Sequence, residues 1–195
     1  MDDAQLSIPG GGSPFAGFWR RVTAASIDSS VLGLPMYIVM GLQGASLFTL
    51  LNEEFDSYLA AREALFTALS AEMLQIATIF AALYLVYKTG FEASGMRATI
   101  GKLVVGLRVT DRQGNRLSIP AAAVRSWPAW APAALLVLDA RLGTNGILAN
   151  AAGPAALLAC VTVAITPRKR GLHDIMAGAL VVRAGAKFGA TQATL

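Results

Sequence analysis

Residues 17–28 read Gly-Phe-Trp-Arg-Arg-Val-Thr-Ala-Ala-Ser-Ile-Asp and lead directly into an apolar run that continues to about residue 51. Arg20 and Arg21 stand where a chain would enter a membrane, and Asp28 stands about two helical turns further in. An ionised carboxylate at that depth is costly, so it needs a partner or a task. This stretch predicts a membrane-spanning helix that carries a structural or functional charge.

The composition indicates a membrane protein rather than a soluble domain. The 195 residues are 55% hydrophobic and only 14% charged, with a mean hydropathy of +0.55, whereas an average soluble domain is nearer a quarter charged. The single cysteine, Cys160, excludes an intrachain disulfide. The N-terminal residues are polar and acidic and lack the pattern of a cleavable signal peptide, so we expect the first apolar segment to remain as an anchor.

Four apolar segments have about the length that a bilayer requires. They cover residues 21–51, 71–87, 120–138 and 147–165, and a crossing helix needs roughly 17–25 residues. The second segment is the shortest, but helix-forming sequence precedes it. The alternative is a soluble bundle of four buried helices, although the third and fourth segments show no polar stripe at the helical period. The sequence therefore favours four transmembrane helices surrounded by the lipid bilayer.

The distribution of basic residues predicts the orientation. Of the 16 Lys and Arg residues, only Arg62 and Arg141 fall in the loops after the first and third segments, and the other 14 flank the opposite ends of the segments. Because basic loops stay in the cytoplasm, we expect both termini and the 88–120 loop to be cytoplasmic. The net charge of +4 then reflects topology and contact with anionic lipid headgroups, and no nucleic-acid partner is expected.

The 88–120 loop contains a strand-like pattern. Residues 102–110 read Lys-Leu-Val-Val-Gly-Leu-Arg-Val-Thr, a turn-forming cluster follows at 111–115, and a second β-rich run covers 179–183. These runs predict a small cytoplasmic β element, and the alternative is an extended basic segment on the lipid surface.

The domain boundaries follow from the same patterns. We expect residues 1–16 to be a flexible cytoplasmic N-terminus, residues 17–184 to form the membrane domain, and residues 185–195 to be a disordered tail.

Five charged or titratable residues are candidates for a functional role. Arg21 and Asp28 share a helix face but are roughly 10 Å apart along the axis, so we expect Asp28 to pair with a basic group from elsewhere. Arg20 and Arg21 are either anchors that reach the headgroups or functional partners. Asp28 is either part of a static ion pair that locks helix packing or a proton or cation site. Asp174 could meet either arginine at the membrane surface, and the adjacent His173 could change charge near neutral pH.

The motif search gives no indication of an enzyme. The sequence contains no phosphate-binding loop of the type Gly-x-x-x-x-Gly-Lys-Ser/Thr, no Cys-x-x-Cys and no His-Glu-x-x-His. A lone histidine supports neither a multi-histidine metal site nor a Ser/His catalytic pair. We therefore expect no catalytic residue, no cofactor and no metal site.

Three motifs, in this order, resemble the RDD family of bacterial membrane proteins. They are Phe-Trp-Arg-Arg-Val-Thr-Ala-Ala-Ser-Ile-Asp at 18–28, Ala-Thr-Ile-Gly-Lys-Leu-Val-Val-Gly-Leu-Arg-Val-Thr-Asp at 98–111, and Arg-Gly-Leu-His-Asp-Ile-Met-Ala-Gly-Ala-Leu-Val-Val at 170–182. The family name records an arginine and two aspartates, which match Arg21, Asp28 and Asp174. Ile100 stands where the family more often has proline. The resemblance implies a bacterial plasma (inner) membrane protein, and some relatives are associated with sodium/proton exchange.

The sequence thus predicts an all-α membrane protein with four transmembrane helices and a small cytoplasmic β element. Two functions remain open. The first is a non-catalytic membrane module that binds lipid or a partner protein. The second is a transporter or transport subunit for cation/proton exchange that uses Asp28. Four spans leave little room for alternating access in a monomer, so transport would require a homo-oligomer or a partner membrane protein.

Overall fold

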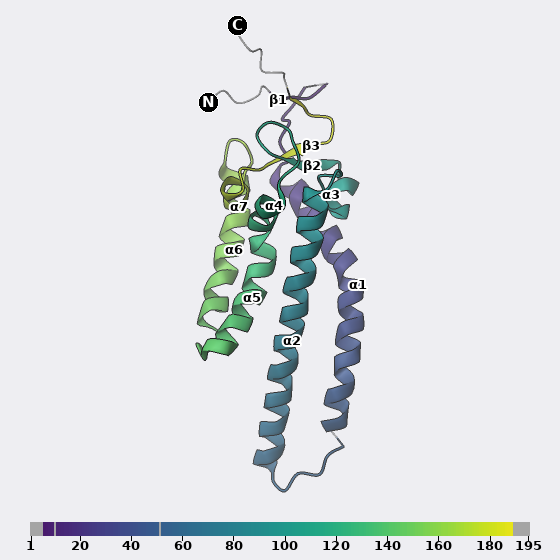
Figure 1. Cartoon of the computed structure of the whole chain (residues 1–195), viewed down its shortest axis with the longest axis vertical. Coiled ribbons are helices and arrows are strands. Elements are labelled where there is room, and N and C mark those ends of the chain that lie inside the picture. The colour runs from purple at the N-terminus through teal and green to yellow at the C-terminus, as the bar shows by residue number, and fades with distance from the viewer. Residues whose placement is uncertain (1–5, 10, 51, 189–195) are drawn as a thin grey trace.

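The computed structural model describes residues 6–9, 11–50 and 52–188, with the side chains of 43–48 and 50 outside the description. Four long helices stand side by side, and the short helices and strands gather at one end, which we call the sheet end (Figure 1). The long helices are α1 (Phe18–Leu50), α2 (Tyr58–Ala93), α5 (Trp127–Leu142) and α6 (Ile147–Ile165). The short helices are α3 (Ile100–Val104), α4 (Ile119–Arg125) and α7 (Leu172–Met176).

The long helices have the length and surface of membrane spans. Residues 18–42 of α1, the whole of α2 and the whole of α6 are each long and apolar enough to cross a bilayer, and α4 with α5 gives a fourth if the bent pair counts as one span. Large apolar side chains cover their outer faces, and Leu34, Phe66 and Ile165 are at least 70% exposed. Lipid can cover such a surface, because the side chains are apolar and the backbone polar groups of a helix are hydrogen-bonded within the helix.

Helix α2 is much longer than the predicted span at 71–87. It begins after Ser57, whose side chain accepts a hydrogen bond from Ala60 N at 3.2 Å, and continues to Ala93. At 1.5 Å per residue, α1 and α2 are roughly 50 Å long, whereas a hydrocarbon core is about 30 Å thick. Both helices therefore extend past α5 and α6 at the far end of the bundle (Figure 1). The predicted end of the first span, residue 51, lies outside the described residues.

The third predicted span, 120–138, is not one straight helix. The chain bends by 75° between α4 and α5, and Ser126 is the junction residue. Pro128 follows two residues later, and its ring removes a backbone donor and crowds the preceding turn, so a continuous helix is disfavoured there. The bend leaves α4 at the sheet end and sends α5 along the bundle.

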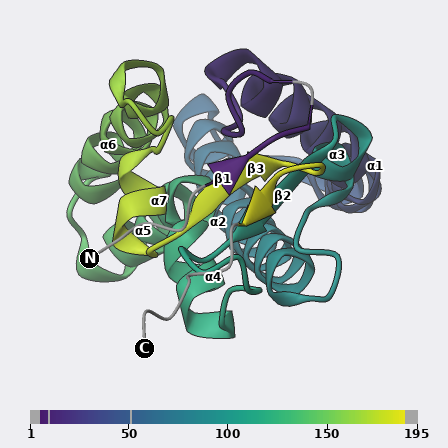
Figure 2. The same ribbon diagram turned by 90° about the horizontal axis from the view of Figure 1, so that it is seen from above.

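Two small antiparallel sheets lie across this end of the helices (Figure 2). Strand β2 (Leu107–Thr110) pairs with β3 (Leu180–Arg183), and β1 (Leu6–Ser7) pairs with β4 (Lys187–Phe188). The predicted β-rich runs are confirmed at 107–110 and 180–183, but residues 100–104 form α3 rather than the start of a strand. The predicted turn at 111–115 is also confirmed, because Asp111 Oδ1 accepts hydrogen bonds from Gln113 N and Asn115 N at 2.9 and 2.7 Å.

The strand pairs correct the predicted boundaries of the domain. Segment 1–16 was expected to be flexible, but Leu6–Ser7 forms β1 and Phe15 bridges to Val182 of β3. Similarly, Lys187–Phe188 forms β4 within the segment expected to be disordered. The remaining parts of these two predictions, 1–5 and 189–195, lie outside the described residues.

A compact apolar core sits between the sheet and the helix ends. It is formed by seven buried residues, namely Ala16, Leu107, Val109, Leu117, Ala122, Ala179 and Val181. Burying each Val or Leu side chain contributes on the order of 2 kcal/mol. This core holds β2, β3, α4 and the segment before α1 together, and thereby fixes where the charged residues of the sheet end meet.

Candidate functional site

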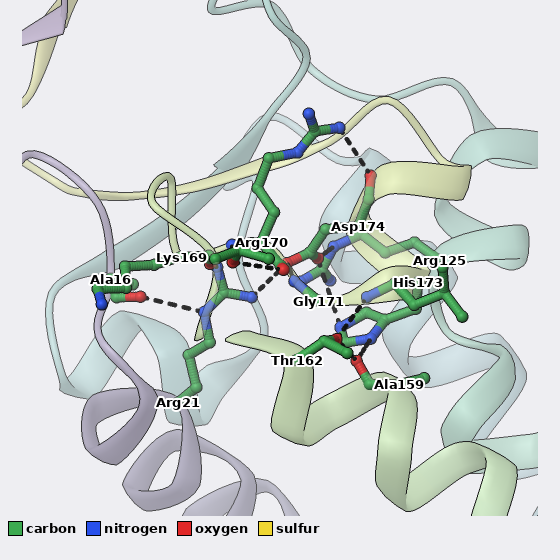
Figure 3. Close-up of polar contacts among 12 residues, drawn as sticks. Ala16, Arg21, Arg125, Ala159, Thr162, Lys169, Arg170, Gly171, His173 and Asp174 are labelled. Carbon is green, nitrogen blue, oxygen red and sulfur yellow. Dashed lines mark hydrogen bonds and ion pairs between the residues drawn. The ribbon is translucent and has the colours of Figure 1, made fainter. Parts of the chain in front are cut away.

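Arg21 and Asp174 lie 153 positions apart in the sequence and form a buried ion pair. Arg21 projects from the first turns of α1, and its Nη1 donates to Asp174 Oδ2 (Figure 3). Its Nη2 donates to the carbonyl oxygen of Lys169, and its Nε donates to that of Ala16 at 3.2 Å. One guanidinium group therefore connects α1 to α7 and to the α6–α7 connection. A guanidinium suits this role because it is planar and has five N–H donors.

The pair is one end of a longer network of alternating charges. Asp174 Oδ1 accepts from Arg125 Nε at 2.8 Å, and Arg125 Nη1 donates to Glu92 Oε2 at 2.5 Å. The other oxygen of Glu92 pairs with Lys102 Nζ. No side chain in this network is more than 12% exposed. We call these five residues the ion network, and it links α1, α2, α3, α4 and α7.

Burial and neighbouring charges set the protonation of the network members that lie outside the spans. Burial alone would raise the pKa of Asp174, but Arg125 and Arg21 hold it well below its usual range. Burial lowers the pKa of Lys102 to about 8, against the attraction of Glu92. Near neutral pH the network thus contains a carboxylate at Asp174 and an ammonium at Lys102.

His173 lies beside the network and does not behave as the expected switch near neutral pH. Burial, opposed by the Asp174 carboxylate, lowers the pKa of His173 to about 4. Its Nδ1 lies 3.1 Å from the carbonyl oxygen of Ala159 in α6. Next to it, Gly171 N donates to Asp174 Oδ2 at 3.1 Å, and a Cβ at Gly171 would sit 2.7 Å from the same Ala159 oxygen. These contacts dock α7 closely on α6.

Asp28 is buried, and within the described residues it has no basic partner, which corrects the expected ion pair. Tyr87 Oη and Gly101 N donate to its Oδ1, each at 2.7 Å, and Thr99 Oγ1 donates to its Oδ2 at 2.6 Å. Among the residues that the structure describes, no Lys or Arg nitrogen lies within 4.0 Å of it. Two hydroxyls and a backbone amide are sufficient here because they satisfy both oxygens of a buried carboxyl group.

Gly101 explains why α3 lies so close to α1. A Cβ at Gly101 would sit 2.1 Å from the carbonyl oxygen of Ala24 and 2.8 Å from Asp28 Oδ1. Only glycine permits this approach, which lets Gly101 N reach the carboxyl group. Asp28 therefore fixes the start of α3, and α3 in turn positions Lys102 next to Glu92.

The structure separates the five predicted residues into distinct groups. Arg21 and Asp174 pair directly, His173 packs beside them, and Asp28 binds the start of α3. Arg20 is exposed, and in the described part of the chain it has no carboxylate within 4.0 Å. Sequence reasoning missed three members of the ion network, namely Glu92, Lys102 and Arg125. One signal was available, because Glu92 is the only acidic residue in a basic stretch that covers 88–110.

A cavity of about 170 Å³ lies next to the ion network, with room for on the order of ten water molecules. Four basic side chains line it, namely Arg21, Lys88, Lys102 and Arg125, together with Asp28 and His173. The rest of the wall is mainly apolar and comes from α1, α5 and α6, through Phe18, Val22, Ala25, Pro128, Ala129, Cys160 and Val163. Val22, Ala25 and Cys160 are exposed, so the cavity communicates with the outer surfaces of α1 and α6.

Among the described residues, the one further buried acid has a structural task at the far end. Asp139, near the end of α5, accepts hydrogen bonds from Leu148 N and Ala149 N at 3.1 and 2.8 Å. It thereby satisfies free amides in the first turn of α6 and closes the α5–α6 hairpin. Within the described residues, no group of three or more His, Cys, Asp or Glu side chains is placed to hold a metal ion.

Apolar helices of membrane length, joined at one end by a buried ion network, define the chain as a helical membrane protein. The model of the RDD family matches residues 15–178, which is most of the sequence, and the chain belongs to this family. It is also similar to the uncharacterized protein YxaI of Bacillus subtilis (strain 168), with 31% identity over 104 residues, which are 53% of this chain and 68% of the relative. No solved structure matches the chain.

Proposed function

We propose that this RDD protein is a non-catalytic membrane module that binds a membrane lipid in the cavity beside the ion network. The observation that carries the proposal is the composition of the cavity wall, in which basic side chains from α1 to α4 face apolar residues from α1, α5 and α6. A lipid has the same two parts, a polar headgroup and an apolar chain. Basic pockets between membrane helices are suited to lipid headgroups.

The ion network supports this role because it makes the basic wall rigid. Arg21, Lys102 and Arg125 each contact a carboxylate that is fully buried. Removing one partner from such a network leaves an uncompensated buried charge, at a cost of about 3–5 kcal/mol. The basic groups are therefore held in place before a ligand arrives, which reduces the entropy lost on binding.

Native mass spectrometry of the protein purified in mild detergent tests the proposal. We expect a retained phospholipid, and Ala25→Phe should remove it by filling the cavity from α1. Ala155→Phe is the matched control, because Ala155 is an exposed residue of α6 that does not line the cavity. A wild-type chain without retained lipid, or equal retention in both variants, would contradict lipid binding at this cavity.

We place the protein in the bacterial plasma (inner) membrane with the sheet end and both termini in the cytoplasm. The distribution of Lys and Arg supports this orientation, as basic loops remain on the cytoplasmic side. Glu53, Glu54 and Asp56 follow α1 at the far end, which agrees with an outward-facing loop. Association with a second copy or a partner membrane protein remains part of the proposal.

The alternative function is cation/proton exchange, and the position of Asp28 on the cavity wall is the observation in its favour. Its three hydrogen-bond donors weigh against it, since they occupy the oxygens that a transported cation would need. Purified protein in sealed liposomes with a pH gradient separates the two functions. We expect no flux when a monovalent cation is added, whereas flux that Asp28→Asn abolishes would establish exchange.

A further inference from the structure

The basic residues on the cavity wall are unequally paired. Four basic residues line the cavity. Three of them, Arg21, Lys102 and Arg125, form ion pairs with Asp174 or Glu92. A partly buried charge without a counter-ion is unfavourable in a medium of low dielectric.

Among the described residues, Lys88 is the basic group on the wall without a carboxylate partner. In the described part of the chain no carboxylate oxygen lies within 4.0 Å of its Nζ. The nearest aromatic contact is Tyr84, whose ring centroid is 5.8 Å from Nζ. Lys88 comes from α2, one residue after Tyr87, which binds Asp28. Its ammonium therefore lines the cavity with its hydrogen-bonding capacity largely unused.

We propose that the cavity selects a phospholipid whose headgroup carries a single negative charge, with Lys88 as the counter-ion of its phosphodiester. This inference rests on the proposed function and specifies the class of lipid. A phosphodiester monoanion matches the one lining ammonium that has no ion pair among the described residues. In a zwitterionic lipid the phosphodiester is already balanced by the lipid's own cation, so it is a weaker counter-ion for Lys88.

The other basic residues contribute a favourable field and keep their partners. Moving Arg125 onto a ligand would break its contacts with Glu92 and Asp174 and leave two buried carboxylates short of a cation. Lys88 can turn toward a ligand without such a loss. The acyl chains then follow the apolar wall, where Val22 and Cys160 open toward the membrane on α1 and α6.

The experiment is a competition between two lipids, followed by native mass spectrometry. Delipidated protein in detergent is mixed with equal amounts of dioleoyl phosphatidylglycerol and dioleoyl phosphatidylcholine. We expect a preference of at least about tenfold for phosphatidylglycerol, the factor that one hydrogen bond to a charged group provides. Lys88→Gln should remove the preference while retaining lipid binding, and Lys88→Arg should preserve it.

Two controls distinguish the remaining interpretations. Arg62→Gln makes the same change of charge at an exposed site near the other end of α2 and should leave the preference intact. Inorganic phosphate at millimolar concentration should not displace phosphatidylglycerol. Displacement would mean that the site binds free phosphate rather than a lipid headgroup, and would contradict this inference. Equal binding of the two lipids, or a preference that survives Lys88→Gln, would overturn this inference and leave the proposed function standing. A protein that binds neither lipid would overturn both.

Discussion

Replacing Asp28 distinguishes a carboxyl group held by neutral donors from one held by a cation. The structure predicts that Asp28→Asn is mild and that Asp28→Ala is severe. Asparagine Oδ1 can accept from Tyr87 Oη and Gly101 N, while its Nδ2 donates to Thr99 Oγ1. The exchange works because a hydroxyl group both donates and accepts hydrogen bonds.

The magnitudes follow from counting these three contacts. In Asp28→Asn all three hydrogen bonds remain, although they are weaker because the side chain no longer carries a charge. Burying a neutral amide costs less than burying a carboxylate, which offsets this weakening. We therefore expect the free energy of unfolding to fall by at most about 1 kcal/mol. In Asp28→Ala three donors lose their acceptor at about 1–3 kcal/mol each, and the two hydroxyls can turn elsewhere in part. We therefore expect Asp28→Ala to lower the free energy of unfolding by about 3–5 kcal/mol. The backbone N–H of Gly101 cannot reorient toward another acceptor, so it is left without a partner.

Thermal unfolding in detergent, followed by intrinsic tryptophan fluorescence, measures the difference. At roughly 2–4 °C per kcal/mol for a chain of this size, Asp28→Ala should lower the midpoint by about 6–20 °C and Asp28→Asn by no more than about 4 °C. Equal losses in the two variants would refute the reasoning, because they would mean that the charge itself, and hence a cation, holds Asp28 in place.

Three further predictions concern other parts of the chain. Gly101→Ala should destabilise the protein by several kcal/mol, since its Cβ would overlap the backbone of α1, whereas Gly90→Ala, where a Cβ meets open space, should be neutral or slightly stabilising in the same unfolding assay. The pKa of His173 is about 4 in the folded state and 6.5 as its ordinary value, so the unfolded state binds more protons and stability should fall by up to about 3 kcal/mol as the pH drops from 6.5 to 4. The midpoint of His173→Gln should fall less over the same range, and an equal fall would exclude this residue as the cause. In a cysteine-free background, a cysteine at Ser57 should react with an impermeant thiol reagent in intact cells and one at Asn115 should not; labelling at 115 would overturn the orientation.

The helices could be predicted from the sequence because hydropathy and length are local properties. The predicted fourth span, 147–165, coincides with α6. The extension of α2 to Ala93 was harder to see, because its last turns carry Lys88, Thr89 and Glu92 and resemble a polar loop. In the structure these turns lie at the sheet end, where contacts with α3 and α4 take the place of lipid. Hydropathy alone does not distinguish a helix that continues into such contacts from one that stops.

The bend in the third span illustrates a different limit. Pro120 and Pro128 were both visible in the sequence, but proline at the start of a helix is favourable and proline inside a helix is not. Which of the two applies depends on where the helix starts. Pro128 becomes the second residue of α5 only because the chain turns at Ser126, and that turn places Arg125 in the ion network.

The partners of the candidate charges could be predicted only in part. A contact of Asp174 with Arg20 or Arg21 was one expectation, and the structure pairs Asp174 with Arg21. A basic partner was expected for Asp28, whereas the hydrogen bonds to its carboxyl group come from neutral donors. Pairing between distant segments depends on tertiary contacts, and the hydrophobic periodicity of the sequence does not predict which segments meet. The backbone amide of Gly101 is invisible to a search for charged partners, which is why a basic residue was expected there.

A double-mutant cycle tests the central claim most directly, namely that Arg21 serves the second aspartate of the pattern and not the first. Free energies of unfolding in mixed detergent micelles would be measured for Arg21→Gln, Asp174→Asn, Asp28→Asn and the two double variants with Arg21→Gln. We predict a coupling energy of about 1–3 kcal/mol between Arg21 and Asp174, and less than about 0.5 kcal/mol between Arg21 and Asp28. A coupling of Arg21 to Asp28 as large as its coupling to Asp174 would contradict the account.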